Sequence, residues 1–203
     1  MTTLDDVLER ARTLGVLGPG PVSDHVVHSE VFLEALRGRD GSVVDLGSGA
    51  GVPGLIIACA RPDLTVTLID SRMRRAALLE EAVEALALGD RVRVLGGRAE
   101  DLGRDPELRG QFDVATARSF GSPPVVAECG APFLRVGGHL IVSEPPQTSP
   151  RWPADGLALV GLRPVPWEDR AVAVMEQVEL CPEGFPRRNG LPAKRPLFGP
   201  PPG

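Results

Sequence analysis

The fold of this chain is decided by one stretch, Val43-Val44-Asp45-Leu46-Gly47-Ser48-Gly49-Ala50-Gly51-Val52-Pro53-Gly54. Apolar residues lead into an acid, glycines follow at every second position, and an apolar helical stretch comes next. Glycines permit a tight turn and let a ligand approach the backbone closely. The following helix offers free N–H groups at its start. This order predicts the first strand-to-helix junction of an α/β sheet, where nucleotide-like ligands bind.

Two ligand classes fit this junction. The segment from Gly49 to Gly54 matches G-x-G-x-x-G, and Asp70 lies near the spacing of a ribose-binding acid in dinucleotide enzymes. The longer pattern D-x-G-x-G-x-G, in which Asp45 ends the strand, uses every residue and is typical of S-adenosylmethionine (SAM) sites in Rossmann-like methyltransferases. We therefore favour SAM as the cofactor. A nicotinamide-dependent oxidoreductase and a purely structural turn remain the alternatives.

The length, composition and net charge of the chain limit the classes of protein to which it can belong. With 203 residues, 42% of them hydrophobic and 24% charged, the chain suits one globular domain over 1–203. We expect N-terminal helices over 1–40, a Rossmann-like core over 41–180 and a basic, proline-rich tail over 181–203. The net charge of -5 excludes a wholly basic nucleic-acid-binding surface, so an RNA contact needs a local patch.

The sequence also lacks features that membrane and metal-ion partners would require. No signal peptide opens the chain and no apolar run is long enough to cross a bilayer, which predicts a cytoplasmic protein without a membrane partner. His25 and His28 lie three apart on a predicted helix, but no third ligand accompanies them. We therefore predict no metal site.

Alternating strand and helix patterns predict a mostly parallel, seven-stranded sheet with helices on both faces. The first helix is expected to be capped by Thr3 and the second by Ser23. The expected parallel strands cover 42–46, 64–69, 92–95, 112–117 and 139–142, with a helix over 72–88, and an antiparallel hairpin of 157–165 and 171–180 closes the sheet.

Candidate cofactor contacts follow the second and third strands. Asp70 ends the second strand, where its carboxylate can accept hydrogen bonds from two ribose hydroxyls or cap the helix that Ser71 and Arg72 open. The loop Arg98-Ala99-Glu100-Asp101 is expected to flank the adenine. Arg72 and its neighbours Arg74 and Arg75 form either a solvated face or a phosphate-facing patch.

Arg118 follows the fourth strand and is expected to face the methyl group being transferred. Enzymes that methylate exocyclic amines of adenine or cytosine often carry Asn/Asp-Pro-Pro-Tyr/Phe/Trp here, so arginine disfavours that chemistry. A planar guanidinium binds carboxylate, phosphate or a guanine edge through paired hydrogen bonds. We predict a catalytic role for Arg118, with a structural cation as the alternative.

The tail combines stiffening prolines with four cations. A frayed basic terminus and a contact to RNA phosphates both fit this composition, and we favour the RNA contact. The candidate RNA-binding residues are Arg187, Arg188, Lys194 and Arg195.

Four separated blocks resemble one family, the 16S ribosomal RNA guanine-N7 methyltransferases of the glucose-inhibited division protein B type. The segment 25–29 resembles R-H-I-L-D-S, and 45–54 resembles D-L-G-S-G-A-G-F-P-G. Residues 98–100 and 116–120 resemble R-A-E and T-A-R-A. The tail over 185–197 resembles Y-P-R-R-x-G-x-P-A-K-x-P-L and is the most specific of the four.

This resemblance implies a class I SAM-dependent methyltransferase fold and methyl transfer to guanine N7 in small-subunit ribosomal RNA, with the RNA or the assembled subunit as partner. It implies SAM contacts at Gly47, Val52, Ala99, Glu100 and Arg118. The glycine motif and the second strand complete the candidate set with Asp45, Gly49, Gly51, Asp70 and Ser71.

The chain departs from the family pattern at three places. The arginine before the histidine is Asp24, the acid before the serine is His28, and Ser143-Glu144 replaces a lysine after the fifth strand. A diverged methyltransferase acting on another RNA or a small molecule, and a SAM-binding protein without ribosomal RNA activity, are the alternatives. Guanine N7 carries no proton, so positioning rather than a general base is the expected mechanism.

Overall fold

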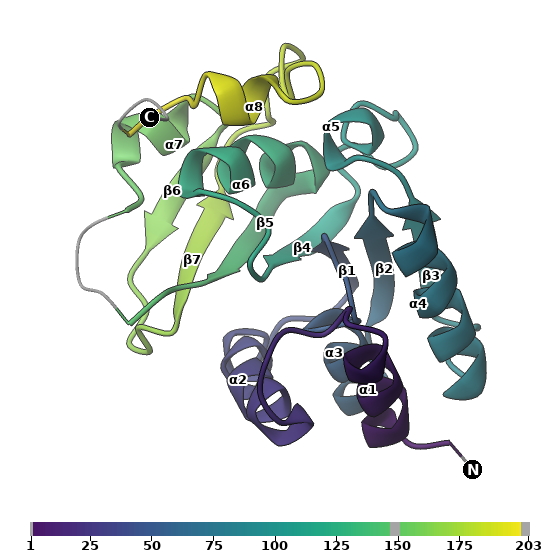
Figure 1. Cartoon of the computed structure of the whole chain (residues 1–203). Helices are drawn as coiled ribbons and strands as arrows, with labels where there is room; N and C mark the ends of the chain where they lie inside the picture. Colours follow the sequence, from purple (N-terminus) through teal and green to yellow (C-terminus); the bar gives the residue numbers. More distant parts are fainter. Residues whose placement is uncertain (1, 147–150, 200–203) are drawn as a thin grey trace.

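The computed structural model describes residues 2–146 and 151–199, so both ends of the expected 1–203 boundary lie outside the described residues. Strands and helices alternate along the chain (Figure 1). In order they are α1 (Leu4–Thr13), α2 (Val22–Ala35), β1 (Ser42–Leu46), α3 (Gly54–Ala60), β2 (Thr65–Asp70), α4 (Met73–Ala85), β3 (Val92–Gly96), α5 (Ala99–Leu102), β4 (Phe112–Ala117), α6 (Pro123–Gly130), the 3-10 turn η1 (Ala131–Phe133), β5 (Leu134–Ser143), α7 (Ala154–Ala158), β6 (Leu162–Val165), β7 (Val172–Gln177) and α8 (Leu191–Lys194).

The strands form one seven-stranded sheet in the order β3-β2-β1-β4-β5-β7-β6. The pairs among β1 to β5 are parallel, whereas β7 is antiparallel to both β5 and β6. The order reverses beside β1, so the loops after β1 and β4 meet at one edge of the sheet. The expected Rossmann-like methyltransferase fold is confirmed, including its closing hairpin.

Alternation along the strands places a core on each face of the sheet. On β1, Val43 packs into a cluster with α2, α3 and α4, and Val44 packs into the opposite cluster with α6 and α7. Figure 1 shows α1, α2 and α3 on one side of the sheet and α5, α6 and α8 on the other. Because both faces are covered, the strand ends are the parts of the sheet left open to a ligand.

The helix starts agree with the sequence at α1 and differ at α2. Thr3 and Asp6 form the expected capping box of α1. The second helix begins at Val22, with Pro21 as the extended residue before it and no side-chain cap. The prediction of Ser23 as the cap was wrong, because Ser23 lies inside the first turn.

Two segments near the end of the sheet also differ from the prediction. The fifth strand begins at Leu134 rather than 139, because Gly138 lets the chain pass close to β4: a Cβ there would lie 3.0 Å from the carbonyl oxygens of Phe112 and Asp113. The apolar stretch 157–165 is part helix, with Leu157 buried in α7, and part strand. A short apolar run does not distinguish these two states.

Candidate active site

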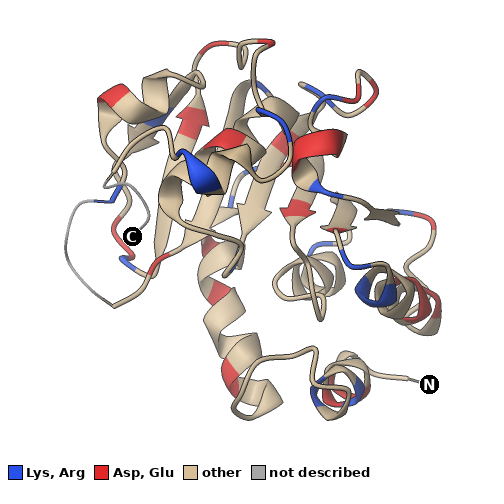
Figure 2. Ribbon diagram, turned by 45° about the horizontal axis from the view of Figure 1, so that its top comes forward, with Lys and Arg blue, Asp and Glu red and all other residues tan. Residues whose placement is uncertain are grey.

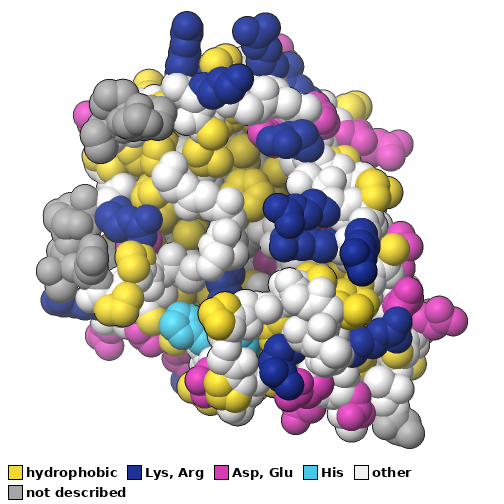
Figure 3. Space-filling view, viewed as in Figure 1, with side chains coloured by type: hydrophobic (Ala, Val, Ile, Leu, Met, Phe, Trp, Pro, Cys, Tyr) yellow, Lys and Arg dark blue, Asp and Glu magenta, His cyan; other side chains and the backbone are white. Residues whose placement is uncertain are grey.

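A cavity of about 430 Å³ lies where the chain leaves β1, β2 and β4, with α5 and α8 completing its walls. This volume is in the range of small-molecule and cofactor sites. Figure 3 shows this face of the molecule, with hydrophobic side chains in a hollow and lysine and arginine side chains around it. Five predicted cofactor residues meet at this first cavity, namely Gly47, Asp70, Ser71, Ala99 and Glu100.

Asp70 is the buried acid of the first cavity, with 3% of its surface exposed. Its Oδ2 accepts the N–H of Gly49 at 2.9 Å, and its Oδ1 accepts the N–H of Arg72 at 2.8 Å. The Arg75 guanidinium lies 3.9 Å from Oδ2. Each carboxylate oxygen has two acceptor sites, so Asp70 can anchor the loop and still accept hydroxyl groups of a ligand.

The glycines of the first loop serve different purposes. Gly47 has a φ of +66° and lines the cavity, where a Cβ would lie 2.8 Å from the ring of Phe120. At Gly51 and Gly54 a Cβ would collide with the side chains of Leu55 and Leu68. Protein packing therefore requires the latter two glycines, and Gly47 is the one whose bare backbone faces the cavity.

The remaining residues of the motif lie behind the cavity wall. Val52 is buried among side chains of α1 and α3. Asp45 is fully buried, and its Oδ1 accepts the hydroxyl of Thr116 at 2.8 Å. Its Oδ2 lies beside Gly54 and has no hydrogen-bond partner within 2–146 and 151–199. Burial raises the pKa of Asp45 to about 6, although the Thr116 and Ser48 hydrogen bonds oppose this. Asp45 supports the loop from behind.

Glu100 connects the first cavity to the tail. Its Oε1 accepts the N–H of Gly190 at 3.1 Å and a guanidinium N–H of Arg98 at 3.0 Å. Burial acts to raise the pKa of Glu100, but these hydrogen bonds and the Arg98 charge hold it below its usual value. Gly190 and Ala193 line the cavity. The tail is therefore part of the cofactor-sized site.

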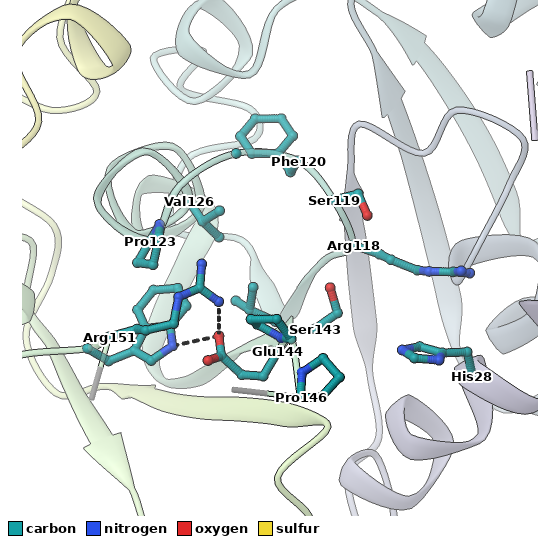
Figure 4. Close-up of a pocket in the computed structure, with 14 residues that line it drawn as sticks. His28, Arg118, Ser119, Phe120, Pro123, Val126, Ser143, Glu144, Pro146 and Arg151 are labelled. Atoms are coloured by element: carbon teal, nitrogen blue, oxygen red, sulfur yellow. Dashed lines mark hydrogen bonds and ion pairs between the residues drawn. The ribbon is translucent and has the colours of Figure 1, made fainter. Parts of the chain in front are cut away.

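A second cavity of about 410 Å³ adjoins the first (Figure 4). The segment Ser119-Phe120-Gly121, which follows β4, lines both cavities. The second cavity extends from this partition to the end of β5. Ligands bound in the two cavities would both contact this short segment.

Arg118 lies at one end of the second cavity and is held by a histidine. Its Nη2 donates to Nδ1 of His25 at 2.8 Å. We assign the His25 proton to Nε2, which faces the carbonyl oxygen of Gly18 at 3.3 Å. Desolvation lowers the pKa of Arg118, opposed by the charge of Asp45. The Arg118 Nη1 is buried and unpaired within the described chain, so the guanidinium would have to turn toward the cavity to donate to a ligand there.

The tail is folded against the domain rather than frayed. The Arg187 guanidinium donates from Nε and Nη2 to Oε1 and Oε2 of Glu128 at 2.8 and 2.6 Å, and Glu128 is fully buried in α6. Arg187 is thereby committed to holding the tail. The other three tail cations, Arg188, Lys194 and Arg195, are exposed.

Sequence reasoning missed three contributors to the site. Glu128 is an acid within the apolar helix α6, a pattern that indicates a buried partner but does not name Arg187. His25 was placed on a predicted helix and considered only as a metal ligand, whereas its contact to Arg118 joins positions 93 residues apart. Phe120 lines both cavities, and the family motif did not predict this role.

Two findings concern residues 2–146 and 151–199 alone. These residues contain no cluster of three or more His, Cys, Asp or Glu side chains that could hold a metal ion. None of their helices has the length and apolar character that a membrane crossing requires.

Comparison with known proteins identifies the family. The sequence model described as "rRNA small subunit methyltransferase G" (GidB) matches residues 20–145. The ribosomal RNA small subunit methyltransferase G of Moorella thermoacetica is 37% identical, covering 85% of this chain and 77% of that protein. The protein of the same name from Rubrobacter xylanophilus is 35% identical, covering 94% and 78%.

The fold has counterparts among solved structures. The antibiotic-resistance methyltransferase Kmr matches with a TM-score of 0.55 and 21% identity, covering 72% of this chain and 91% of that one. At this identity the match concerns the fold alone. From the family match and the two relatives, the chain belongs to the rRNA small subunit methyltransferase G (GidB) family.

Proposed function

We propose that this protein transfers a methyl group from SAM to N7 of a guanine in 16S ribosomal RNA. The observation that carries the proposal is the pair of cavities sharing the Ser119–Gly121 partition, one with a ribose-type acid and one lined by Arg118. The curated relatives, named for methylation of small-subunit ribosomal RNA, support the same assignment.

The first cavity has the features that SAM requires. Asp70 would accept the ribose hydroxyls, and the bare backbone of Gly47 would face the ligand. The backbone of Ala99 and the carboxylate of Glu100 would flank the adenine. When bound, SAM supplies a reactive methyl group on a positively charged sulfur. The residues described here bind and orient that nucleoside.

The chemistry at guanine N7 matches what the second cavity offers. N7 carries a lone pair and no proton, so no side chain has to remove one. The requirement is alignment of N7 with the methyl donor, which is catalysis by proximity. A guanidinium can donate to O6 of guanine or to a phosphate. N7 itself must stay free of hydrogen bonds, because its lone pair forms the new bond to the methyl group. We assign Arg118 to orient the target nucleotide, with His25 positioning Arg118.

A local basic surface would supply RNA affinity despite the net charge of -5. In Figure 2, α4 is blue near its start and red farther along, so its charges are separated. Arg72, Arg75 and Arg98 line the first cavity beside the exposed tail cations. We propose that this surface contacts the small ribosomal subunit or its RNA, which would place the protein in the cytoplasm.

Substitution of Asp70 by asparagine is expected to weaken SAM binding about 10- to 100-fold, because hydrogen bonds to charged groups are strong and an amide nitrogen cannot accept the Gly49 N–H. Calorimetric titration measures the effect. The control is Asp63→Asn, which removes an exposed acid paired with Arg61. Equal SAM affinity of wild type and Asp70→Asn would contradict the assignment of this cavity.

Replacing Arg188, Lys194 and Arg195 together by glutamine is expected to flatten the salt dependence of RNA binding. Each lost phosphate contact lowers the slope of log K against log salt by about 0.7 to 0.9, so the slope of the triple variant should fall by about 2.1 to 2.7. The matched control replaces three exposed arginines of the N-terminal region, Arg10, Arg12 and Arg37. An unchanged slope in the tail variant would remove the tail from the RNA interface.

The proposed function is tested with labelled SAM and small subunits from cells that lack this methyltransferase. We expect stoichiometric label in 16S RNA and none in large-subunit RNA. Tight SAM binding without incorporation would instead identify a SAM-binding protein. Binding of NADH in place of SAM would identify the oxidoreductase alternative.

A further inference from the structure

Glu144 stands in the second cavity, directly after β5, where the family pattern has a lysine. Its backbone N–H donates to the carbonyl oxygen of Ala171 at 2.7 Å, which fixes it beside β7. Its side chain is largely buried, with 13% exposed. A carboxylate held in this way recognises hydrogen-bond donors, whereas the lysine it replaces is itself a donor.

The two oxygens of Glu144 have different roles. Oε1 accepts the indole N–H of Trp152 at 2.9 Å and a guanidinium N–H of Arg151 at 3.2 Å. These two donors use both acceptor sites of that oxygen. Oε2 makes no hydrogen bond within the described part of the chain, so its two acceptor sites are open to a ligand.

The cavity around Glu144 has the form of a base-binding slot. Phe120, Val126 and Trp152 contribute apolar walls, and Pro145 and Pro146 lie beside Glu144. Proteins that act on one base hold it between such apolar side chains and read its edge with hydrogen bonds. In Figure 4 the Glu144 carboxylate lies across the cavity from Ser119 and Phe120, the partition toward the cofactor site.

We propose that Glu144 selects guanine by accepting hydrogen bonds from N1–H and the 2-amino group of the target base. This inference rests on the proposed function. These two donors lie side by side on the Watson–Crick edge, on the opposite side of the purine from N7. With that edge on Glu144, N7 faces the Ser119–Gly121 partition. Adenine has an unprotonated N1 and no 2-amino group, so it would leave Oε2 of the buried carboxylate without a hydrogen-bond partner.

The test compares two RNAs in the substrate form that is methylated by the wild-type protein. One carries guanine at the target position, and the other carries inosine, which lacks only the 2-amino group. We expect wild-type kcat/KM to be about 10- to 100-fold lower on inosine, the range for a hydrogen bond to a charged group. Equal rates on both RNAs would overturn the role of Glu144 while leaving the proposed function standing.

The second arm repeats the comparison with Glu144→Gln. Its amide oxygen must stay toward Arg151 and Trp152, so its NH₂ replaces Oε2 and faces the donors of the base. We expect the guanine-to-inosine ratio to fall to within about threefold of one. The matched control is Glu176→Gln, which makes the same change at a carboxylate that is paired with Arg163 and does not line the cavity, and it should keep the preference for guanine.

Three outcomes distinguish failure of this inference from failure of the proposed function. Discrimination that persists in Glu144→Gln would overturn the assignment, since another group would then read the 2-amino group. A matching loss in Glu176→Gln would also overturn it, because that carboxylate does not line the cavity and the loss would then not report a contact of Glu144 with the base. Absence of methylation of the guanine RNA by wild-type protein would overturn the proposed function and this inference together.

Discussion

Replacing Arg118 by lysine lowers the rate of methyl transfer by about 100- to 1,000-fold, the range for loss of one donor aimed at the reacting groups. SAM affinity is expected to change less than about threefold, because Arg118 lines the second cavity rather than the first. Lysine keeps the charge but cannot donate to His25 and to a nucleotide through one planar group. Single-turnover rates and calorimetric SAM titration measure the two quantities.

The control for Arg118→Lys is Arg39→Lys, which changes an arginine that donates to the carbonyl oxygen of Ala35 on α2. This control should leave both quantities unchanged. Equal losses of rate and SAM affinity in Arg118→Lys would show that Arg118 only supports the cofactor pocket. His25→Leu removes the acceptor that orients Arg118. It should lower the rate of methyl transfer and change SAM affinity by less than about threefold.

Replacing Arg187 by methionine is expected to lower the free energy of unfolding by about 3–5 kcal/mol, because it leaves the Glu128 carboxylate buried without its partner. Glu128 is fully buried, so it cannot reach water without displacing the helix. SAM affinity should fall as well, since Gly190 and Ala193 of the same tail line the cofactor cavity. Urea unfolding and calorimetric titration measure the two effects.

A double variant separates the cost of the unpaired charge from the packing of the tail. Glu128→Leu combined with Arg187→Met replaces the ion pair by apolar groups and should recover most of the lost stability. A loss below about 1 kcal/mol in Arg187→Met alone would contradict this account, because that is the value of an exposed ion pair.

The parts of the fold that could be predicted are those with a local signature. The β1 strand with its glycine turn, Asp70 at the end of β2 and the capping box at Thr3 each follow from residues adjacent in the chain. The hairpin was predicted, but helix α7 within 157–165 was not, because apolar runs there satisfy both helix and strand patterns.

The parts of the site that could not be predicted depend on long-range contacts. Glu128 and Arg187 are 59 residues apart, and only the fold brings the tail against α6. Asp45 was expected among the cofactor contacts, but its side chain faces Thr116 and Gly54, since Thr116 is its cross-strand partner. Successive side chains along β1 point to opposite faces of the sheet, which sets the direction of the Asp45 side chain. The spacing of the glycine motif does not indicate that direction.

The central claim is methylation at N7 of one guanine, and strand scission tests it most directly. N7-methylguanosine makes RNA cleavable by aniline after borohydride reduction, whereas methylation at other positions does not. We predict one new cleavage site in 16S RNA, present only after incubation with this protein and SAM. Labelled RNA without any aniline-sensitive site would place the methyl group elsewhere and contradict the account.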